Sequence, residues 1–331
     1  MNILVNMPWD LHDTFVTDNV KRKLENLGNV EYNKTGAFYD GIELREKLQN
    51  VDVLITGWGN PKMDKSTFEG TNVKLIAHTG GTIANLINMD VYDTEIKVIS
   101  GNNYYAESVA EGTLAYILFM LRRMDFYSAE LKRGIWHDAG SISTEGLLDQ
   151  TVGIVSLGAI SKMLIRMAKP FRIKFKVYST RQDEALAEEL GIEYASLEEI
   201  FKTCKIISLH TASTPETYHM IDTPLFKLIQ DGAIFINTSR GDVINEATLA
   251  EELKTGRFRA LLDVYKVEPL PADSPLFNLD NVTLFPHIAG PTFDRREPIT
   301  EFLIDDIKRF ILNGKPLENE ILKSVAERMT N

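Results

Sequence analysis

Short apolar runs alternate along the chain with longer segments of mixed polarity. Apolar runs of this kind are typical of strands buried on both faces, and the longer segments are typical of the helices that connect parallel strands. The pattern predicts strands at Ile3–Val5, Val51–Ile55, Leu75–Ala77, Lys97–Ile99, Val152–Val155, Lys174–Tyr178, Ile206–Leu209, Ala233–Ile236, Ala260–Leu262 and Val282–Leu284. It predicts helices at Glu107–Met124, Lys162–Ala168, Asp183–Leu190, Glu246–Lys254 and Phe293–Leu312. We therefore expect an α/β protein built on parallel sheets.

The length and the composition narrow the class further. A chain of 331 residues is long enough for two domains, at roughly 150 residues per domain. The longest apolar run, Leu114–Leu121, is far shorter than the ~20 residues needed to cross a bilayer, and no secretory signal is expected at the amino terminus. A single cysteine, Cys204, excludes an internal disulfide and is typical of a reducing compartment. We expect a cytoplasmic protein.

The charge balance argues against nucleic acid or an anionic membrane as a partner. There are 36 Lys and Arg against 47 Asp and Glu, which gives a formal net charge of −11. The electrostatic field of this negative charge also repels an anionic ligand, so a site for such a ligand needs its own local cations. The histidines and the cysteine do not have the spacing of metal ligands, and no metal site is expected.

Three ionisable residues each follow a predicted strand near the end of the chain. Arg240 follows Ala233–Ile236, Glu268 comes after Ala260–Leu262, and His287 comes after Val282–Leu284. Ligands of open parallel sheets bind beyond the carboxyl ends of the strands, where these side chains are expected to meet. A guanidinium, a carboxylate and an imidazole at one edge can bind a carboxylate and transfer a proton to a carbonyl.

The loop between the predicted strand Val152–Val155 and the helix after it has the spacing of a dinucleotide-binding turn. Ser156, Gly158 and Ser161 stand where the dinucleotide fingerprint has three glycines. Gly158 allows a close backbone approach to a pyrophosphate, and Ser161 is small enough for the packing position. The side chain of Ser156 narrows the turn, so we expect a phosphate site of reduced affinity at this helix N-terminus.

Several sequence blocks together resemble the D-isomer-specific 2-hydroxyacid dehydrogenases. The blocks are NTSRGDVINEATL (237–249), LDVYKVEPL (262–270), LFPHIAG (284–290), YYAESVAEGTLAYILFMLRR (104–123) and the segment 147–171. The resemblance implies two Rossmann-like doubly wound parallel-sheet domains with the active-site cleft between them. It also implies a discontinuous substrate-binding domain at 1–100 plus 290–331, a dinucleotide-binding domain at 101–289, and a homodimer.

The resemblance also implies roles for single residues. Arg240 would bind the substrate carboxylate, His287 would be the general acid or base, and Glu268 would orient His287. The substrate contacts would be Trp58, Gly80, Gly81, Thr82 and Arg240. The coenzyme contacts would be Ser156, Gly158, Ala159, Ile160, Ser179, Thr180, Arg181, His210, Thr211, Ala212, Thr217, Thr238, Ser239, Asp263 and Gly290.

Several of these positions depart from the family pattern or have a second interpretation. Thr82 stands where relatives usually have a glycine, and Ala212 replaces a proline. Asp263 would hold the nicotinamide carboxamide, or it caps its strand end. Trp58 is either an aromatic wall of the substrate site or an anchor packed on the domain.

The residues after Lys174–Tyr178 favour NADP(H) over NAD(H) as the coenzyme. Relatives specific for NAD have an acid at this strand end, which hydrogen-bonds the ribose. Here Ser179, Thr180 and Arg181 follow, and they can donate to a 2′-phosphate. Asp183 and Glu184 come next, and they keep NAD(H) as the alternative.

The resemblance implies an oxidoreductase that transfers a hydride between a nicotinamide coenzyme and a small 2-keto or D-2-hydroxy acid. Phosphorylated acids are expected to be poor substrates, because the loop Gly57–Gly59 has no arginine. A formate dehydrogenase is one alternative, and Glu268 counts against it since formate oxidation needs no proton relay. The other alternative is a nucleotide-sensing binding protein of the corepressor type.

Overall fold

The computed structural model describes residues 1–329, apart from the side chains of residues 9–11. Two units are formed. Unit 1 comprises Met1–Tyr105 and the segment from Pro291 onward, and unit 2 comprises Ala106–Gly290. These limits lie within a few residues of those expected for the two domains, whose functional labels remain predictions.

Unit 1 is built on a five-stranded sheet in which all paired strands are parallel. Its order is β2-β1-β3-β4-β5, so the chain changes direction in the sheet between β1 and β3. The strands are β1 (Asn2–Asn6), β2 (Asn29–Tyr32), β3 (Val53–Thr56), β4 (Leu75–His78) and β5 (Lys97–Ser100). At such a switch point the loops after neighbouring strands diverge and leave space for a ligand.

Unit 2 is built on a seven-stranded parallel sheet of the order β12-β11-β10-β9-β6-β7-β8. The strands are β6 (Thr151–Val155), β7 (Lys174–Tyr178), β8 (Ile192–Tyr194), β9 (Ile206–Leu209), β10 (Ile234–Asn237), β11 (Arg259–Leu262) and β12 (Val282–Leu284). Its switch point lies between β6 and β9, where a Rossmann sheet binds a dinucleotide.

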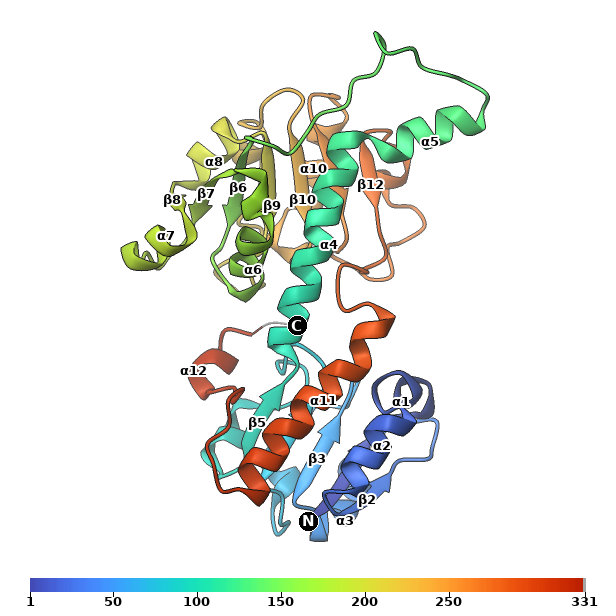
Figure 1. The fold of residues 1–331 in the computed structure, drawn as a ribbon, viewed down its shortest axis with the longest axis vertical. Coiled ribbons are helices and arrows are strands. Elements are labelled where there is room, and N and C mark those ends of the chain that lie inside the picture. Colours follow the sequence, from blue (N-terminus) through green and yellow to red (C-terminus); the bar gives the residue numbers. More distant parts are fainter. Residues whose placement is uncertain (330–331) are drawn as a thin grey trace. The chain divides into compact units, whose positions relative to one another are not determined.

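Helices connect the strands of both sheets (Figure 1). In unit 1, the α-helices are α1 (Trp9–Phe15), α2 (Asp18–Glu25), α3 (Gly41–Lys47), α11 (Arg296–Ile307) and α12 (Lys323–Ala326). In unit 2, they are α5 (Met124–Lys132), α6 (Ala159–Ala168), α7 (Glu184–Leu190), α8 (Leu197–Thr203), α9 (Thr223–Phe226) and α10 (Glu246–Leu253). The long helix α4 (Asn102–Arg122) begins in unit 1 and continues in unit 2.

The expectation of parallel α/β architecture is confirmed, because the central strands are apolar and fully buried. Strands β3, β4, β9 and β10 are buried along their whole length. The apolar pattern did not predict the edge strands β2 and β8, whose residues are exposed or half-buried.

Three predicted helices differ from those in the structure. Helix α6 begins at Ala159 rather than Lys162. Helix α4 begins at Asn102 rather than Glu107. The predicted helix Phe293–Leu312 divides into a 3-10 turn, α11 and a π-helical end at Lys308–Leu312. Within residues 1–329, no helix is long and apolar enough to span a membrane.

Candidate active site

The loop that carries Arg240 is held by the buried side chain of Asn237, the last residue of β10. The Asn237 Oδ1 accepts hydrogen bonds from the backbone N–H of Ser239 (3.0 Å) and from its hydroxyl (2.7 Å), while Nδ2 donates to the carbonyl of Arg240 (3.1 Å). The next residue must be glycine, because a Cβ on Gly241 would lie 2.0 Å from the carbonyl carbon of Tyr265. The backbone on both sides of Arg240 is therefore fixed.

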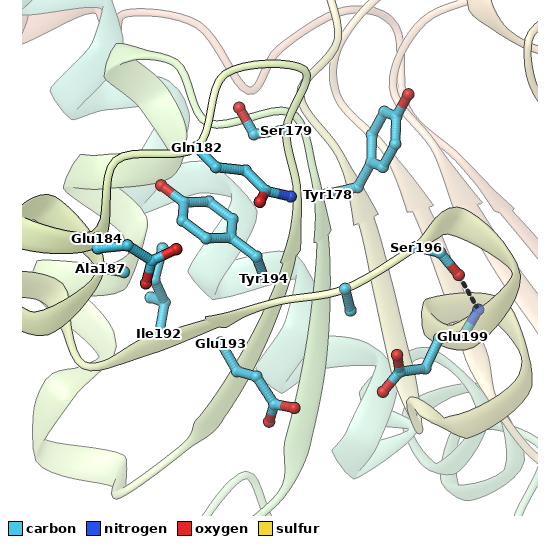
Figure 2. Close-up of a pocket in the computed structure, with 11 residues that line it drawn as sticks. Tyr178, Ser179, Gln182, Glu184, Ala187, Ile192, Glu193, Tyr194, Ser196 and Glu199 are labelled. Atoms are coloured by element: carbon cyan, nitrogen blue, oxygen red, sulfur yellow. Dashed lines mark hydrogen bonds between the residues drawn. The ribbon is translucent and has the colours of Figure 1, made fainter.

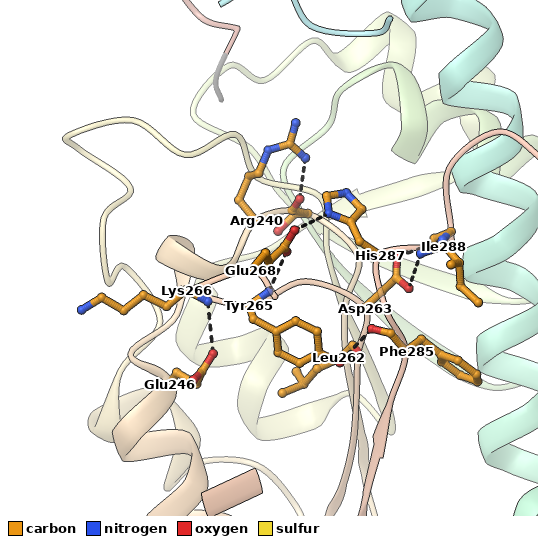
Figure 3. Close-up of polar contacts among 12 residues, drawn as sticks. Arg240, Glu246, Leu262, Asp263, Tyr265, Lys266, Glu268, Phe285, His287 and Ile288 are labelled. Atoms are coloured by element: carbon orange, nitrogen blue, oxygen red, sulfur yellow. Dashed lines mark hydrogen bonds and ion pairs between the residues drawn. The ribbon is translucent and has the colours of Figure 1, made fainter. Parts of the chain in front are cut away.

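Glu268 and His287 form a hydrogen-bonded pair at the ends of the neighbouring strands β11 and β12 (Figure 3). The Glu268 Oε2 lies 2.8 Å from the His287 Nδ1, and Oε1 accepts from the backbone N–H of Tyr265 at 3.0 Å. One carboxylate oxygen therefore anchors Glu268 while the other holds the ring. The opposite ring nitrogen of His287, Nε2, is left for another partner, and the side chain is 47 % exposed.

Asp263 anchors the loop that carries His287. Its Oδ1 accepts from the Tyr116 hydroxyl (3.0 Å) and the Ile288 N–H (2.9 Å), and its Oδ2 accepts from the Ala289 N–H (2.9 Å). Burial raises the pKa of Asp263, and these donors act in the opposite direction. The contacts fit the interpretation of Asp263 as a strand-end cap. Oδ2 accepts one hydrogen bond here and can accept a second. The contact to the nicotinamide carboxamide therefore stays a prediction.

Arg240 brings a partly buried cation to the same edge. Its Nη1 donates to the carbonyl of Ser239 at 2.7 Å (Figure 3). Burial lowers the pKa of the guanidinium, and the nearby Glu268 carboxylate raises it. An arginine nevertheless stays charged at neutral pH. In a chain of net charge −11, this group is a local cation of the kind that a site for an anionic ligand requires.

The loop after β6, which is the candidate phosphate site, has a strained backbone at its first position. Ser156 has φ +82°, a conformation that glycine adopts more easily than serine. Gly158 is the N-cap of α6, and nothing lies within 4 Å of where its Cβ would be. The Ser161 side chain is buried and donates to the carbonyl of Ser156 at 2.6 Å. The open space at Gly158, together with the exposed Ala159 and the half-buried Ile160, fits a pyrophosphate at this helix N-terminus.

Replacement of Ser156 by glycine is expected to strengthen coenzyme binding several-fold and to leave the folded protein at least as stable. A side chain in the left-handed region costs about 1–2 kcal/mol, which glycine avoids, although glycine also gains freedom in the unfolded chain. Fluorescence titration of the coenzyme and thermal unfolding measure the two effects. Ser156→Ala is the matched control, because it removes the hydroxyl but keeps the Cβ. Equal affinities for the Gly and Ala variants would show that the backbone conformation does not limit binding.

The loop after β7 does not present an acid at the strand end. The Ser179 hydroxyl accepts from the Arg181 N–H (3.2 Å) and donates to its carbonyl (2.6 Å), which forms a tight turn. Thr180 and Arg181 are exposed. Asp183 is the N-cap of α7 and accepts from the Leu186 N–H at 3.1 Å. Because this carboxylate caps a helix, it is a poor candidate for the ribose acid of an NAD-specific enzyme.

A groove of about 740 Å³ borders this loop (Figure 2). Its walls come from the end of β7, from β8 and from the segments that follow these strands, and they carry three carboxylates, Glu184, Glu193 and Glu199. A phosphate inside the groove would be repelled by these groups. A 2′-phosphate is therefore better placed on the turn Ser179–Arg181 than in the groove.

The other predicted coenzyme residues lie in the loops after β9, β10 and β12. After β9, the His210 Nε2 lies 3.0 Å from the Ser208 hydroxyl, and burial lowers the pKa of His210 to about 4. Thr211 is buried, Ala212 is exposed, and the Thr217 hydroxyl donates to the Ala212 carbonyl at 2.6 Å. After β10, the Thr238 hydroxyl lies 3.1 Å from that of Thr113. Gly290 is the last residue of unit 2.

The predicted substrate loops lie at the carboxyl edge of the unit 1 sheet. Gly80, Gly81 and Thr82 follow β4, and Trp58 follows β3. His78 is buried at the end of β4, where its Nδ1 lies 2.9 Å from the Thr56 hydroxyl and burial lowers its pKa to about 4. His78 is therefore neutral at physiological pH and supports the loop.

The sequence pattern did not indicate the residues that hold the loops of the candidate site. Asn237, Tyr116 and Tyr265 position Arg240, Asp263 and Glu268 through the hydrogen bonds described above. The sequence contained one signal for these residues: Asn237 is a polar residue at the end of an otherwise apolar strand. The contact from Tyr116 comes from α4 and leaves no local trace in the sequence.

The fold and the geometry of the candidate site fit a nicotinamide-dependent oxidoreductase. The family model of the D-isomer-specific 2-hydroxyacid dehydrogenase NAD-binding domain matches residues 114–289. The chain belongs to this family. It is therefore an oxidoreductase whose relatives transfer a hydride between a nicotinamide coenzyme and 2-keto or 2-hydroxy acids.

Curated relatives agree with this assignment. The chain is 35% identical over 276 residues to a glyoxylate reductase of Thermococcus litoralis, covering 81% of this chain and 82% of the relative. It is 32% identical over 324 residues to a D-3-phosphoglycerate dehydrogenase of Methanocaldococcus jannaschii, covering 97% of this chain. That relative is longer, and the match spans 59% of its length.

Two solved structures share the whole fold. A D-2-hydroxyisocaproate dehydrogenase superposes with a TM-score of 0.81 at 25% identity, covering 97% of this chain and 100% of the other. An acyclic imino acid reductase, solved in complex with NADPH and D-Arg, superposes with a TM-score of 0.79 at 26% identity over the same shares of the two chains.

Proposed function

We propose that this protein reduces small 2-keto acids to D-2-hydroxy acids, with His287 as the proton donor. The observation that carries the proposal is the Glu268–His287 pair, at 2.8 Å, beside a partly buried Arg240. An arginine to bind a carboxylate and an imidazole to protonate a carbonyl oxygen are the two groups that this reduction needs.

Each of the three side chains has a separate task. Arg240 binds the substrate carboxylate and stabilises negative charge at the carbonyl oxygen as that charge develops. His287 gives a proton to this oxygen from Nε2, since Nδ1 faces Glu268. Glu268 fixes the ring and stabilises its protonated form. A bound nicotinamide coenzyme would supply the hydride, with Gly158 and the N-terminus of α6 as the place for its pyrophosphate.

The direct test is a spectrophotometric screen with glyoxylate, hydroxypyruvate and pyruvate, each with NADPH and NADH. We expect loss of reduced-nicotinamide absorbance with at least one of these acids. The absence of turnover with all of them, in a protein that binds the coenzyme, would support the nucleotide-sensing alternative instead.

NADP(H) is the proposed coenzyme, and the turn Ser179–Arg181 is the proposed site of its 2′-phosphate. The specificity constant with NADPH is expected to exceed that with NADH. Arg181→Ala should remove most of the preference, because a charge-assisted contact to phosphate contributes about 1.5–3 kcal/mol. Arg166→Ala is the matched control, since it removes an exposed arginine of the same unit that pairs with Glu189. A parent that prefers NADH would contradict the assignment.

A homodimer and a cytoplasmic location are further proposals. The segment around α5 carries many exposed apolar side chains, which a second copy of the chain could bury. They are Met124, Phe126, Leu131, Ile135, Trp136, Ile142 and Leu148. Sedimentation equilibrium of the whole chain tests the dimer. The buried, unpaired Cys204 fits a reducing compartment.

A further inference from the structure

An arginine surrounded by aromatic rings lies at the carboxyl edge of the unit 1 sheet. Arg296, the first residue of α11, places its guanidinium carbon 5.2 Å from the ring centre of Trp58, 5.8 Å from that of Phe15 and 5.7 Å from that of Phe293. Trp58 in turn meets Phe15 edge-on at 4.9 Å and Tyr105 edge-on at 6.1 Å. We call Phe15, Trp58, Tyr105 and Arg296 the arginine cluster.

Arg296 makes few polar contacts for a half-buried cation. Its Nη1 donates to the Thr14 hydroxyl at a long 3.4 Å, and its Nε is buried without a hydrogen-bond partner. Among the described side chains, no carboxylate pairs with it, whereas Arg172 forms a two-point contact with Asp149. A partly buried guanidinium loses hydration, and aromatic faces replace only part of it. Arg296 therefore retains donors that an anion could use.

The Tyr105 hydroxyl adds a second donor to the cluster. It is buried, and within residues 1–329 its one hydrogen-bonding neighbour is the Trp58 side chain, which can only donate and leaves the hydroxyl proton without an acceptor. An unsatisfied buried hydroxyl costs free energy, which a bound oxygen atom would recover. The cluster thus combines an arginine and a tyrosine, each with an unused polar atom.

The position of the cluster connects it with the predicted substrate loop. Tyr105 packs against Gly81, where an added Cβ would lie 3.1 Å from the tyrosine ring. Gly81 belongs to the loop Gly80–Thr82, which is among the predicted substrate contacts. A substrate bound at this loop would therefore lie beside the cluster.

We propose that Arg296, together with Tyr105 and the wall formed by Trp58, binds a second carboxylate at the far end of the substrate. The preferred substrates are then 2-keto dicarboxylic acids of four or five carbons. One guanidinium neutralises one carboxylate, whereas a phosphate dianion would keep an uncompensated charge in a chain of net charge −11. The proposal rests on the proposed function, since it assumes that 2-keto acids bind at this edge.

The cluster changes the interpretation of the loop Gly57–Gly59. The absence of an arginine from this loop predicts that phosphorylated acids are poor substrates, and this stays a prediction. The structure adds that Arg296 reaches Trp58 from α11, so a cation lies beside the loop without being part of it. Trp58 is also packed against Phe15 rather than standing alone, so it is an anchored wall.

The test compares substrates of equal length that differ only at the far end. Oxaloacetate is paired with 2-oxobutyrate, and 2-oxoglutarate with 2-oxopentanoate, and glyoxylate reports basal turnover. We expect the parent to favour each dicarboxylate by about 10- to 100-fold in kcat/KM, as for a charge-assisted contact. Arg296→Gln should abolish this preference and leave glyoxylate turnover within a few-fold of the parent.

Arg295→Gln is the matched control, because it removes a neighbouring charge that lies over Tyr104 rather than over Trp58. Tyr105→Phe should reduce the preference in part. Calorimetric titration of 2-oxoglutarate and 2-oxopentanoate, without coenzyme, repeats the comparison independently of catalysis.

Three results would overturn the inference. They are equal use of the paired acids by the parent, an unchanged preference in Arg296→Gln, and better use of phosphohydroxypyruvate than of the dicarboxylates. Each can occur while glyoxylate is still reduced, so the inference can fail while the proposed function stands. Failure to reduce any keto acid would instead refute the proposed function.

Discussion

Replacement of His287 by alanine is expected to lower kcat by about 10²–10⁴-fold, the usual contribution of general acid catalysis. The ring is held by Glu268 at 2.8 Å through Nδ1, so Nε2 is the atom that can protonate the carbonyl oxygen. Coenzyme affinity should change little, because the phosphate loop is carried by β6 and α6 rather than by the loop after β12. Steady-state kinetics and fluorescence titration of the coenzyme measure the two quantities.

A second histidine–glutamate pair in unit 2 provides the control. His137 Nε2 lies 3.4 Å from the Glu130 carboxylate, outside the candidate site. His137→Ala should keep a kcat close to that of the parent. Glu268→Gln should give an intermediate loss, because the amide can still orient the ring but no longer stabilises its positive charge. A His287→Ala variant with near-parental kcat would rule out His287 as the proton donor.

The sequence allowed the sheet architecture and the Glu268–His287 pair to be predicted for the same physical reason. Strands buried on both faces are uniformly apolar, so their ends are visible in the sequence. Strands β11 and β12 are parallel neighbours, and residues that follow them emerge at the same edge. The residue types then indicated the chemistry, and the structure places the two side chains in contact.

Features that depend on contacts distant in sequence were not predictable in this way. The anchoring of Asp263 by Tyr116 joins β11 to α4, and Arg296 contacts Trp58, which lies far earlier in the sequence. Neither contact changes the local pattern of apolar and polar residues. The edge strand β2 was missed because its alternation of exposed and half-buried residues gives only a weak apolar signal.

The positive φ of Ser156 shows a second limit of prediction from the sequence. The sequence indicated that a side chain at this position departs from the dinucleotide fingerprint, but it predicted a narrowed turn. In the structure the turn is formed, and the effect of the serine is an unusual backbone angle, φ +82°. The hydrogen bond from Ser161 to the Ser156 carbonyl helps to hold this conformation. The serine is therefore tolerated in a backbone conformation that it rarely adopts, because neighbouring contacts hold the loop.

Replacement of Arg240 by lysine is expected to lower kcat/KM for 2-keto acids by about 10²-fold or more, as does the loss of one donor to a developing negative charge. Lysine keeps the charge but loses the planar fork that binds a carboxylate at two points. It also loses the Nη1 contact to the Ser239 carbonyl, which directs the guanidinium. Steady-state kinetics with the best keto acid, together with thermal unfolding, measure the effect on activity and on the fold.

The comparison that decides the role of Arg240 is between lysine and glutamine at this position. If Arg240 supplied only an attractive field, the lysine variant would keep most of the activity and only Arg240→Gln would lose it. If Arg240 binds the carboxylate through its fork, both variants should be impaired and lysine should recover little. Arg166→Lys, at an exposed pair with Glu189, controls for the exchange itself. Activity within a few-fold of the parent in Arg240→Lys would show that the substrate carboxylate is bound elsewhere, which would leave the backbone of Gly80–Thr82 as the candidate.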